Sequence, residues 1–190
     1  MVVGITGSIA CGKSLVSSYL KNKNYVVIDS DIISHEVLLL EEVKTKLVDI
    51  FGLDILSNNE INRKQLGLKI FNNYDNKIKL QNVVLPYIIK EIKKQISENN
   101  GLVFLDAPLL IEYNLLYLVD KVIVVKVDLQ TQLNRLMKRD NITEEYAIKK
   151  INSVLSSEEK QKYADYVINN SNTIDETYKQ IEIILKKLGV

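Results

Sequence analysis

The sequence of 190 residues contains a single cysteine, Cys11, which excludes an intramolecular disulfide. Proteins that fold in oxidising compartments often depend on disulfides, so this composition favours a cytoplasmic location. Long apolar runs are missing as well: no window approaches the roughly 20 apolar residues that a membrane-spanning helix needs. The first apolar run is only about five residues long and has no basic lead. The sequence therefore predicts neither a signal peptide nor association with a membrane.

An excess of charge of one sign is also absent. The chain has 25 basic and 24 acidic residues and a formal net charge of +1. Proteins that bind nucleic acid through its phosphate backbone usually carry a basic excess, so we expect no nucleic-acid partner. No Pro-rich or Gly-rich linker, internal repeat or low-complexity tract divides the chain. With 46% hydrophobic residues, the sequence fits one compact domain.

Histidine and arginine are scarce. His35 is the only histidine and has no partner at metal-ligand spacing, which argues against a zinc site. Arg63, Arg135 and Arg139 are the only arginines, beside 22 lysines. Lysine supplies a point charge, whereas arginine supplies a planar fork that matches phosphate and carboxylate groups. The three arginines are therefore candidate site residues, with surface positions of no function as the alternative.

A complete GxxxxGK[ST] motif occupies residues 7–14, Gly7-Ser8-Ile9-Ala10-Cys11-Gly12-Lys13-Ser14, directly after an apolar run. In such a P-loop the backbone N–H groups turn inward around nucleotide phosphates and the lysine reaches the β- and γ-phosphates. The serine hydroxyl ligates Mg²⁺, and the following helix adds the positive end of its dipole. The predicted nucleotide-binding residues are Ala10, Cys11, Gly12, Lys13, Ser14 and Leu15, with Ser14 as metal ligand.

Cys11 lies inside this loop as a small residue whose backbone N–H is the useful group. Its place at a helix N-terminus predicts a lowered thiol pKa. We therefore expect the thiol to react with alkylating reagents and bound ATP to protect it.

The apolar runs predict a parallel sheet. Residues 2–6 and 25–28 are β-branched runs on either side of a predicted helix at 13–21, which makes a βαβ unit. Three further strands are predicted, at residues 101–106, 121–127 and 166–168. Their continuous hydrophobicity indicates a sheet covered on both faces. The predicted fold class is α/β, a three-layer P-loop NTPase fold with a five-stranded parallel sheet.

Helical spacing dominates the segments between these strands. Residues 32 to about 99 are too many for one crossover connection, and we expect a helical lobe over the carboxyl ends of the strands, where ligands bind in open α/β sheets. A second helical stretch runs from residue 129 to about 155. The last helix, about 174–188, has the spacing of a packing helix.

Three aspartates follow predicted strands. Asp29 and Asp31 end the second strand and Asp106 ends the third, so all three should lie at the same sheet edge as the P-loop. A carboxylate there would accept a proton from an attacking hydroxyl or hold a water on Mg²⁺, because phosphoryl transfer needs positioned charge and an oriented nucleophile. Helix capping is the alternative for Asp31 and for Asp106.

Arg135 and Arg139 are four residues apart, so they share one face of a helix and are placed to clamp a triphosphate. A solvated helix face, with Asp140 paired to neighbouring lysines, is the alternative. The segment that begins at Asp106 lacks the DxxG pattern of the GTPase switch, and no NKxD pattern appears downstream of it, which favours a kinase over a nucleotide-dependent switch or binding module.

Together, these residues resemble the dephospho-coenzyme A kinase family over nearly the whole chain. The family patterns GxTGxxxxGKS, DADxIA and FG...IL...G.(I/L)(N/D)R..L correspond to residues 4–14, 29–34 and 51–66. The patterns DxPLLxE, QLxRLxxRD and ADxVIxN correspond to residues 106–112, 132–140 and 164–170. All three arginines fall on motif positions.

The resemblance implies transfer of the ATP γ-phosphoryl group to the 3′-hydroxyl of dephospho-coenzyme A, the last step of coenzyme A synthesis, with Mg²⁺. It implies a single kinase domain with a core (about 1–31, 100–128 and 156–190), a helical acceptor lobe (about 32–99) and a small lid (about 129–155). We expect small-molecule substrates only and a monomer or weak oligomer.

The implied site residues follow from the same motifs. Asp31 would be the base that orients the 3′-hydroxyl, while Lys13 and Arg139 complete the catalytic set. Arg135 would bind the nucleotide beside Arg139, and the predicted substrate-binding residues are Asp29, Arg63 and Asp106.

Three positions depart from the family pattern. Leu85 stands where the family has a histidine before Pro86, His35 where it has an arginine, and Val154 where it commonly has a glutamine. The first two lie in the predicted acceptor lobe. Another small-metabolite kinase, or a nucleoside or nucleotide kinase, is therefore the alternative function.

Overall fold

The computed structural model describes residues 1–70 and 73–190; residues 71 and 72, in the predicted acceptor lobe, lie outside the described residues. The chain divides into two compact units. Met1–Ile28 together with Asn99–Val190 is called the P-loop unit below, and Asp29–Glu98 is called the helical unit.

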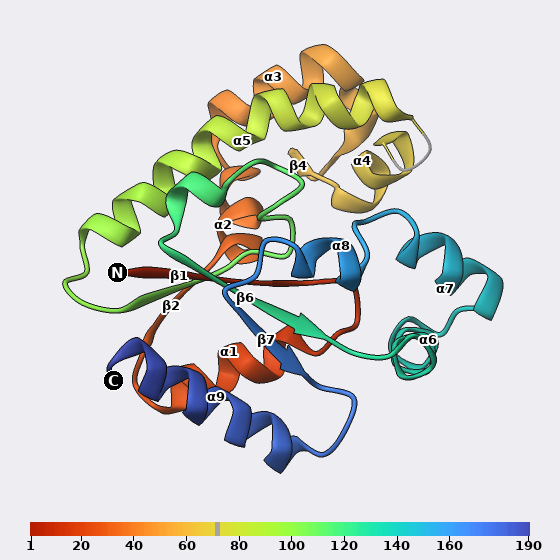
Figure 1. The fold of residues 1–190 in the computed structure, drawn as a ribbon. Coiled ribbons are helices and arrows are strands. Elements are labelled where there is room, and N and C mark those ends of the chain that lie inside the picture. Colours follow the sequence, from red (N-terminus) through yellow and green to blue (C-terminus); the bar gives the residue numbers. More distant parts are fainter. Residues whose placement is uncertain (71–72) are drawn as a thin grey trace. The chain divides into compact units, whose positions relative to one another are not determined.

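A parallel sheet forms the centre of the P-loop unit (Figure 1). Its strands are β1 (Val2–Gly7), β2 (Val26–Asp29), β5 (Val103–Asp106), β6 (Lys121–Lys126) and β7 (Tyr166–Asn169). Within the described residues these five strands stand in the order β2-β5-β1-β6-β7, and β1 pairs in parallel with both β5 and β6. The predicted α/β class and five-stranded parallel sheet are confirmed. Because β1 is central, the P-loop leaves the middle of the sheet.

Helices cover both faces of this sheet, which explains why its strands are hydrophobic throughout. The helices of the unit are α1 (Lys13–Asn22), α6 (Leu129–Asp140), α7 (Glu144–Ile151), α8 (Ser157–Gln161) and α9 (Ile174–Leu188), with a 3₁₀ turn η2 (Leu116–Leu118). One face is covered by α1 and α9, whose Val16, Leu20 and Ile181 are buried with the strand residues Ile5 and Phe104. On the other face, α8 contacts β1 and β6 (Figure 1).

The helical stretch predicted at residues 129–155 consists of α6 and α7. Asn141 ends α6 in the left-handed conformation, with φ of 51°, and Thr143 caps α7 by accepting a hydrogen bond from the N–H of Tyr146. Asparagine tolerates positive φ better than most residues, so the break between the helices is encoded locally.

The helical unit is built around one long helix. Its elements are α2 (Ser30–Val37), α3 (Glu41–Phe51), η1 (Leu53–Ile55), β3 (Leu56–Ser57), β4 (Glu60–Ile61), α4 (Arg63–Ile70) and α5 (Tyr74–Ser97). α5 contacts α2, α3 and α4 and contributes the buried Ile88 and Ile92. The β3–β4 hairpin was not predicted from the sequence; its signal is the pair Asn58 and Asn59, with φ of 51° and 63°.

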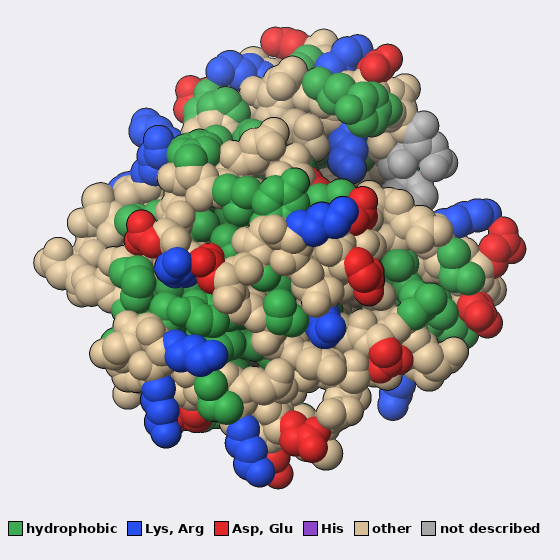
Figure 2. Space-filling view, in the orientation of Figure 1, with side chains coloured by type: hydrophobic (Ala, Val, Ile, Leu, Met, Phe, Trp, Pro, Cys, Tyr) green, Lys and Arg blue, Asp and Glu red, His purple; other side chains and the backbone are tan. Residues whose placement is uncertain are grey.

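Charged side chains of both signs are interspersed on the face drawn in Figure 2. This agrees with the balanced composition of the chain. The expectation that the protein has no nucleic-acid partner stays a prediction.

Candidate active site

The P-loop has a backbone that only glycine allows at two positions. A Cβ atom on Gly7 would lie 2.5 Å from the carbonyl oxygen of Val125, and one on Gly12 would lie 2.0 Å from Nδ2 of Asn170. Gly12 also has φ of 86°, in the left-handed region, and directly precedes α1. The motif glycines are therefore required by close packing as well as by backbone conformation.

Lys13 and Asp106 form an ion pair, and the hydroxyl of Ser17 donates a second hydrogen bond to the same carboxylate. The side chains of Lys13 and Asp106 are 16% and 5% exposed. The pair is possible because β5, which Asp106 ends, lies next to β1. The chain continues from Asp106 in turns instead of an α-helix, so the capping alternative for this residue is wrong.

Arg135 has a free donor group beside the P-loop. Its Nη2 donates to the carbonyl oxygen of Asn170 at 3.0 Å. Its Nη1 is buried and has no hydrogen-bond partner among the described residues. The same nitrogen lies 3.5 Å from the position that a Cβ atom on Gly12 would occupy. A buried cationic donor without a partner is costly unless an acceptor is supplied, and a phosphate oxygen of a nucleotide is such an acceptor.

Arg139 is in a different setting from Arg135. Its side chain is 57% exposed, and its Nε donates to the carboxylate of Asp140 at 2.8 Å. Lys150 of α7 contacts the same carboxylate at 2.7 Å, and these two cations lower the pKa of Asp140 to about 2. The structure thus brings Arg135 to the P-loop and leaves Arg139 on an ion-pair network between α6 and α7.

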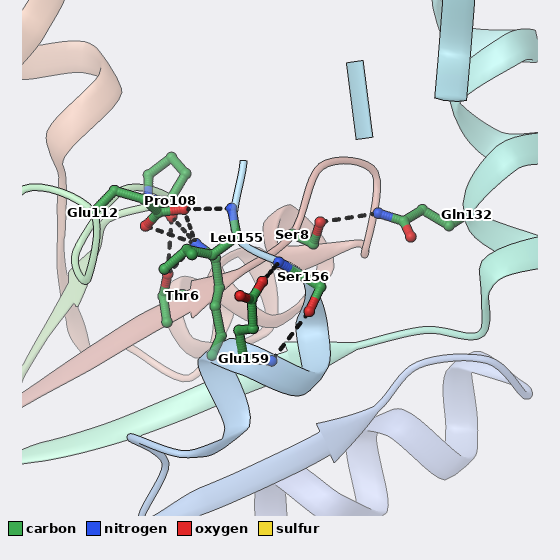
Figure 3. A network of polar contacts seen from close by, with 9 residues as sticks. Thr6, Ser8, Pro108, Glu112, Gln132, Leu155, Ser156 and Glu159 are labelled. Carbon is green, nitrogen blue, oxygen red and sulfur yellow. Dashed lines mark hydrogen bonds and ion pairs between the residues drawn. The ribbon is translucent and has the colours of Figure 1, made fainter. Parts of the chain in front are cut away.

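A buried polar network lies beneath the P-loop (Figure 3). Lys160 of α8 is 1% exposed, and its Nζ lies 2.9 Å from the carboxylate of Glu112. The ammonium also donates to the carbonyl oxygen of Pro108 at 2.6 Å and to the hydroxyl of Thr6 at 3.4 Å. Glu112 in turn accepts a hydrogen bond from the backbone N–H of Leu155 at 3.3 Å.

This network ties the end of β1, the segment after β5 and the segment between α7 and α8 together. The sequence analysis assigned no role to Lys160 or Glu112. Glu112 is the last residue of the DxPLLxE pattern, so a role for it could have been predicted from the sequence. Nothing in the sequence indicates that Lys160 is buried.

The expectation that the pKa of the Cys11 thiol is lowered is wrong. Cys11 is 2% exposed, and burial raises the pKa of its thiol above the ordinary value. Its own loop and the charges of Lys13 and Lys160 act in the opposite direction but are outweighed. The helix N-terminus therefore does not lower the pKa of this thiol, because burial disfavours the charged thiolate.

Three predicted residues, Asp29, Asp31 and Arg63, belong to the helical unit. Asp29 caps α2, where its carboxylate accepts hydrogen bonds from the N–H groups of Asp31 and Ile32 at 3.0 and 3.2 Å. The capping role considered for Asp31 thus belongs to Asp29, and Asp31 lies in the first turn of the helix. Arg63 contacts Nε2 of His35 at 2.5 Å, so the histidine that departs from the family pattern is the partner of the one arginine in this unit.

The described residues contain no group of three or more His, Cys, Asp or Glu side chains arranged to hold a metal. Mg²⁺ bound with a nucleotide needs few protein ligands, since it keeps waters and takes phosphate oxygens. Ser14 is exposed at the start of α1, and Asp106, at the end of β5, is bonded to Lys13 and Ser17 of the same helix. A hydroxyl and a carboxylate in this setting fit a nucleotide-bound Mg²⁺.

The parallel sheet, the GxxxxGKS loop after its central strand and the arginine whose Nη1 is buried beside that loop define a P-loop kinase. The family described as Dephospho-CoA kinase matches residues 1–176. The chain belongs to the dephospho-CoA kinase family, and it is therefore an ATP-dependent kinase.

Individual relatives agree with the family match. The chain is 44% identical to a dephospho-CoA kinase of Bacillus cereus, over 100% of this chain and 98% of the relative. Among solved structures, it resembles TT1252 from Thermus thermophilus with a TM-score of 0.87 and 25% identity, covering 99% of this chain and 97% of that one. It resembles the dephospho-CoA kinase from Campylobacter jejuni with a TM-score of 0.65 and 29% identity, covering 98% and 96%.

None of the helices in the described part of the chain combines the length and apolarity required to span a membrane.

Proposed function

We propose that this protein transfers the γ-phosphoryl group of ATP to the 3′-hydroxyl of dephospho-CoA, the last step of coenzyme A synthesis. The observation that carries the proposal is the buried, unpartnered Nη1 of Arg135 beside Gly12. Together with Lys13, it makes the P-loop a site for a polyanion and not merely a turn. The family match supports the choice of acceptor.

In the ATP-binding half of the site, Lys13 binds the β- and γ-phosphates. Its ammonium group then contacts phosphate oxygens in addition to the carboxylate of Asp106. The backbone of residues 10–15 surrounds the phosphates at the start of α1, where the helix dipole favours negative charge. Arg135 donates its free Nη1 to the nucleotide. Mg²⁺, held by Ser14, neutralises phosphate charge when it is bound.

In the acceptor half, Asp31 takes the proton of the 3′-hydroxyl as the oxygen forms its bond to the γ-phosphorus. The bond from that phosphorus to the β,γ-bridging oxygen breaks, and ADP leaves. Arg139 acts from the lid, residues 129–155, where its exposed side chain leaves its partner Asp140 for the transferring phosphoryl group. Asp29, Arg63 and Asp106 are the proposed substrate-binding residues, with Asp29 also fixing the start of α2.

The domain division proposed for this activity is a core, an acceptor lobe over about 32–99 and a lid. We further propose a cytoplasmic enzyme that works as a monomer or weak oligomer on small molecules. The single cysteine and the balance of 25 basic and 24 acidic residues support this.

The experiment is an ADP-release assay with the purified chain, ATP and Mg²⁺, in which dephospho-CoA, adenosine and AMP are compared as acceptors. We expect ADP release that depends on dephospho-CoA, with a product phosphorylated at the 3′-hydroxyl. Faster turnover with adenosine or AMP would identify a nucleoside or nucleotide kinase and refute the proposed acceptor.

A further inference from the structure

Gln132 is a buried amide that touches the P-loop. It lies in the first turn of α6, is 5% exposed, and its Nε2 donates to the carbonyl oxygen of Ile9 at 2.7 Å and to Oγ of Ser8 at 3.1 Å. Figure 3 shows the side chain reaching from its helix to Ser8. Both acceptors belong to the GxxxxGKS segment, so the contact joins α6 to the loop itself.

The peptide that Gln132 holds precedes a strained residue. Ala10 has φ of 56°, in the left-handed region that non-glycine residues adopt at a cost. Such a conformation persists only where the surroundings hold it. The peptide between Ile9 and Ala10 is trans, so the N–H of Ala10 points away from the carbonyl that Gln132 binds. By holding this carbonyl toward α6, Gln132 directs the Ala10 N–H away from α6.

The helix that carries Gln132 also carries Arg135, one turn further on. A side chain that fixes α6 against the P-loop therefore also sets the distance between the free Nη1 of Arg135 and Gly12. The loop N–H groups and the arginine would then be ordered before any nucleotide binds. Such preorganisation raises affinity because less freedom is lost on binding.

We propose that Gln132 is a positioning residue for ATP: it holds the strained P-loop backbone in its phosphate-binding form and keeps Arg135 beside it. The inference deepens the proposed function and rests on it for the identity of the nucleotide. Packing offers the competing explanation, since Ile9 and Ala10 also pack against Leu133 and Leu136 of α6.

The decisive variant is Gln132→Met, which keeps the length and volume of the side chain but removes its donor. Gln130→Met is the matched control, because Gln130 lies on the same helix, is exposed, and bonds only locally, to Asn134 at 3.3 Å. The readouts are the dissociation constant of ATP, the inhibition constant of inorganic triphosphate, both KM values and the thermal unfolding midpoint.

For Gln132→Met we expect ATP affinity to fall roughly tenfold, the equivalent of one or two net hydrogen bonds. The inhibition constant of inorganic triphosphate should rise by a similar factor, since triphosphate contacts only the phosphate site. The KM for dephospho-CoA should stay within about twofold of the wild-type value. Gln130→Met should match wild type. A well-folded Gln132→Met protein that binds ATP and triphosphate with wild-type affinity would overturn the proposal. An equal rise in KM for ATP and for dephospho-CoA would also overturn it.

Gln132→Glu provides a second route if the methionine variant does not fold. It is isosteric and removes the donor, and its carboxylate would face the Ile9 carbonyl and bound phosphates, so a larger loss of ATP affinity is expected. Wild-type protein that binds ATP but does not phosphorylate dephospho-CoA would refute the proposed function and leave the comparison of ATP affinities intact.

Discussion

Lys160 and Glu112 form an ion pair in which the lysine is almost fully removed from water, with 1% of its side chain exposed. The lysine also holds a backbone carbonyl and a hydroxyl, and the glutamate holds a backbone N–H. Each charge thus has polar partners besides the opposite charge. Removing one member leaves the other largely removed from water and without its counter-charge.

We therefore expect Lys160→Met to lower the free energy of unfolding by about 3 kcal/mol, the range for breaking one side of a buried pair. The double variant Lys160→Met with Glu112→Gln should lose less than the sum of the two single variants. Lys162→Met, at an exposed position two residues away, should change the free energy of unfolding by under about 0.5 kcal/mol. Urea unfolding of wild type and each variant measures these differences, and additive effects would show that the pair does not act as a unit.

The charge of Lys13 is required at the phosphates. Lys13→Met should raise the dissociation constant of ATP about tenfold to a hundredfold, as expected for loss of a charge-assisted contact, and lower kcat as well. The control is Lys21→Met in the last turn of α1, where the side chain is exposed. Calorimetric titration and steady-state kinetics test this, and unchanged ATP affinity would remove Lys13 from the proposed site.

Asp31 is expected to act in chemistry and not in nucleotide binding. Asp31→Asn removes the proposed base and should lower kcat by about 10² to 10⁴, while the dissociation constant of ATP stays within a few-fold. Asp49→Asn, at an exposed position of α3 in the same unit, serves as the control. Transfer by Asp31→Asn within a few-fold of wild type would show that another group accepts the proton.

Asp140 should make stability depend on pH in the acid range. Its pKa is about 2 in the folded protein because Arg139 and Lys150 hydrogen-bond to its carboxylate, compared with an ordinary value of 3.8. A depressed folded pKa adds stability above the unfolded pKa, and that stability is lost as the pH falls from about 4 toward 2. The difference in unfolding midpoint between wild type and Asp140→Asn should therefore be larger at pH 7 than at pH 3. An equal difference at both pH values would mean that the carboxylate charge is not responsible.

The Cys11 thiol should be inert in the folded protein. It is buried, and its pKa is raised, so little thiolate is present at pH 8. Iodoacetamide should modify it far more slowly than in the urea-unfolded chain, even without ATP. Rapid modification of the folded, ATP-free protein would show that the P-loop opens.

The sequence alone was sufficient for the sheet and the motif. Continuous apolar runs mark strands covered on both faces, and the glycines, lysine and serine of residues 7–14 have the spacing of a phosphate site. Helix capping also depends on residues that are near one another in sequence. It was considered for Asp31 and Asp106, whereas the residue that caps α2 is Asp29. Strands, the phosphate-binding motif and helix caps depend on neighbours along the chain, so the spacing of residues in the sequence predicts them.

Tertiary structure decided how each polar side chain of the P-loop unit is used. Arg135 and Arg139 look equivalent by spacing, yet Arg135 has its Nη1 buried beside Gly12, whereas Arg139 is exposed and paired with Asp140. Cys11 is buried in a core cluster with side chains of strands and helices distant in sequence, and this burial raises the pKa of its thiol. Gln132 and Lys160 contact residues more than 100 positions away. Burial and charge pairing are set by the surroundings in space, and spacing along the chain does not encode them.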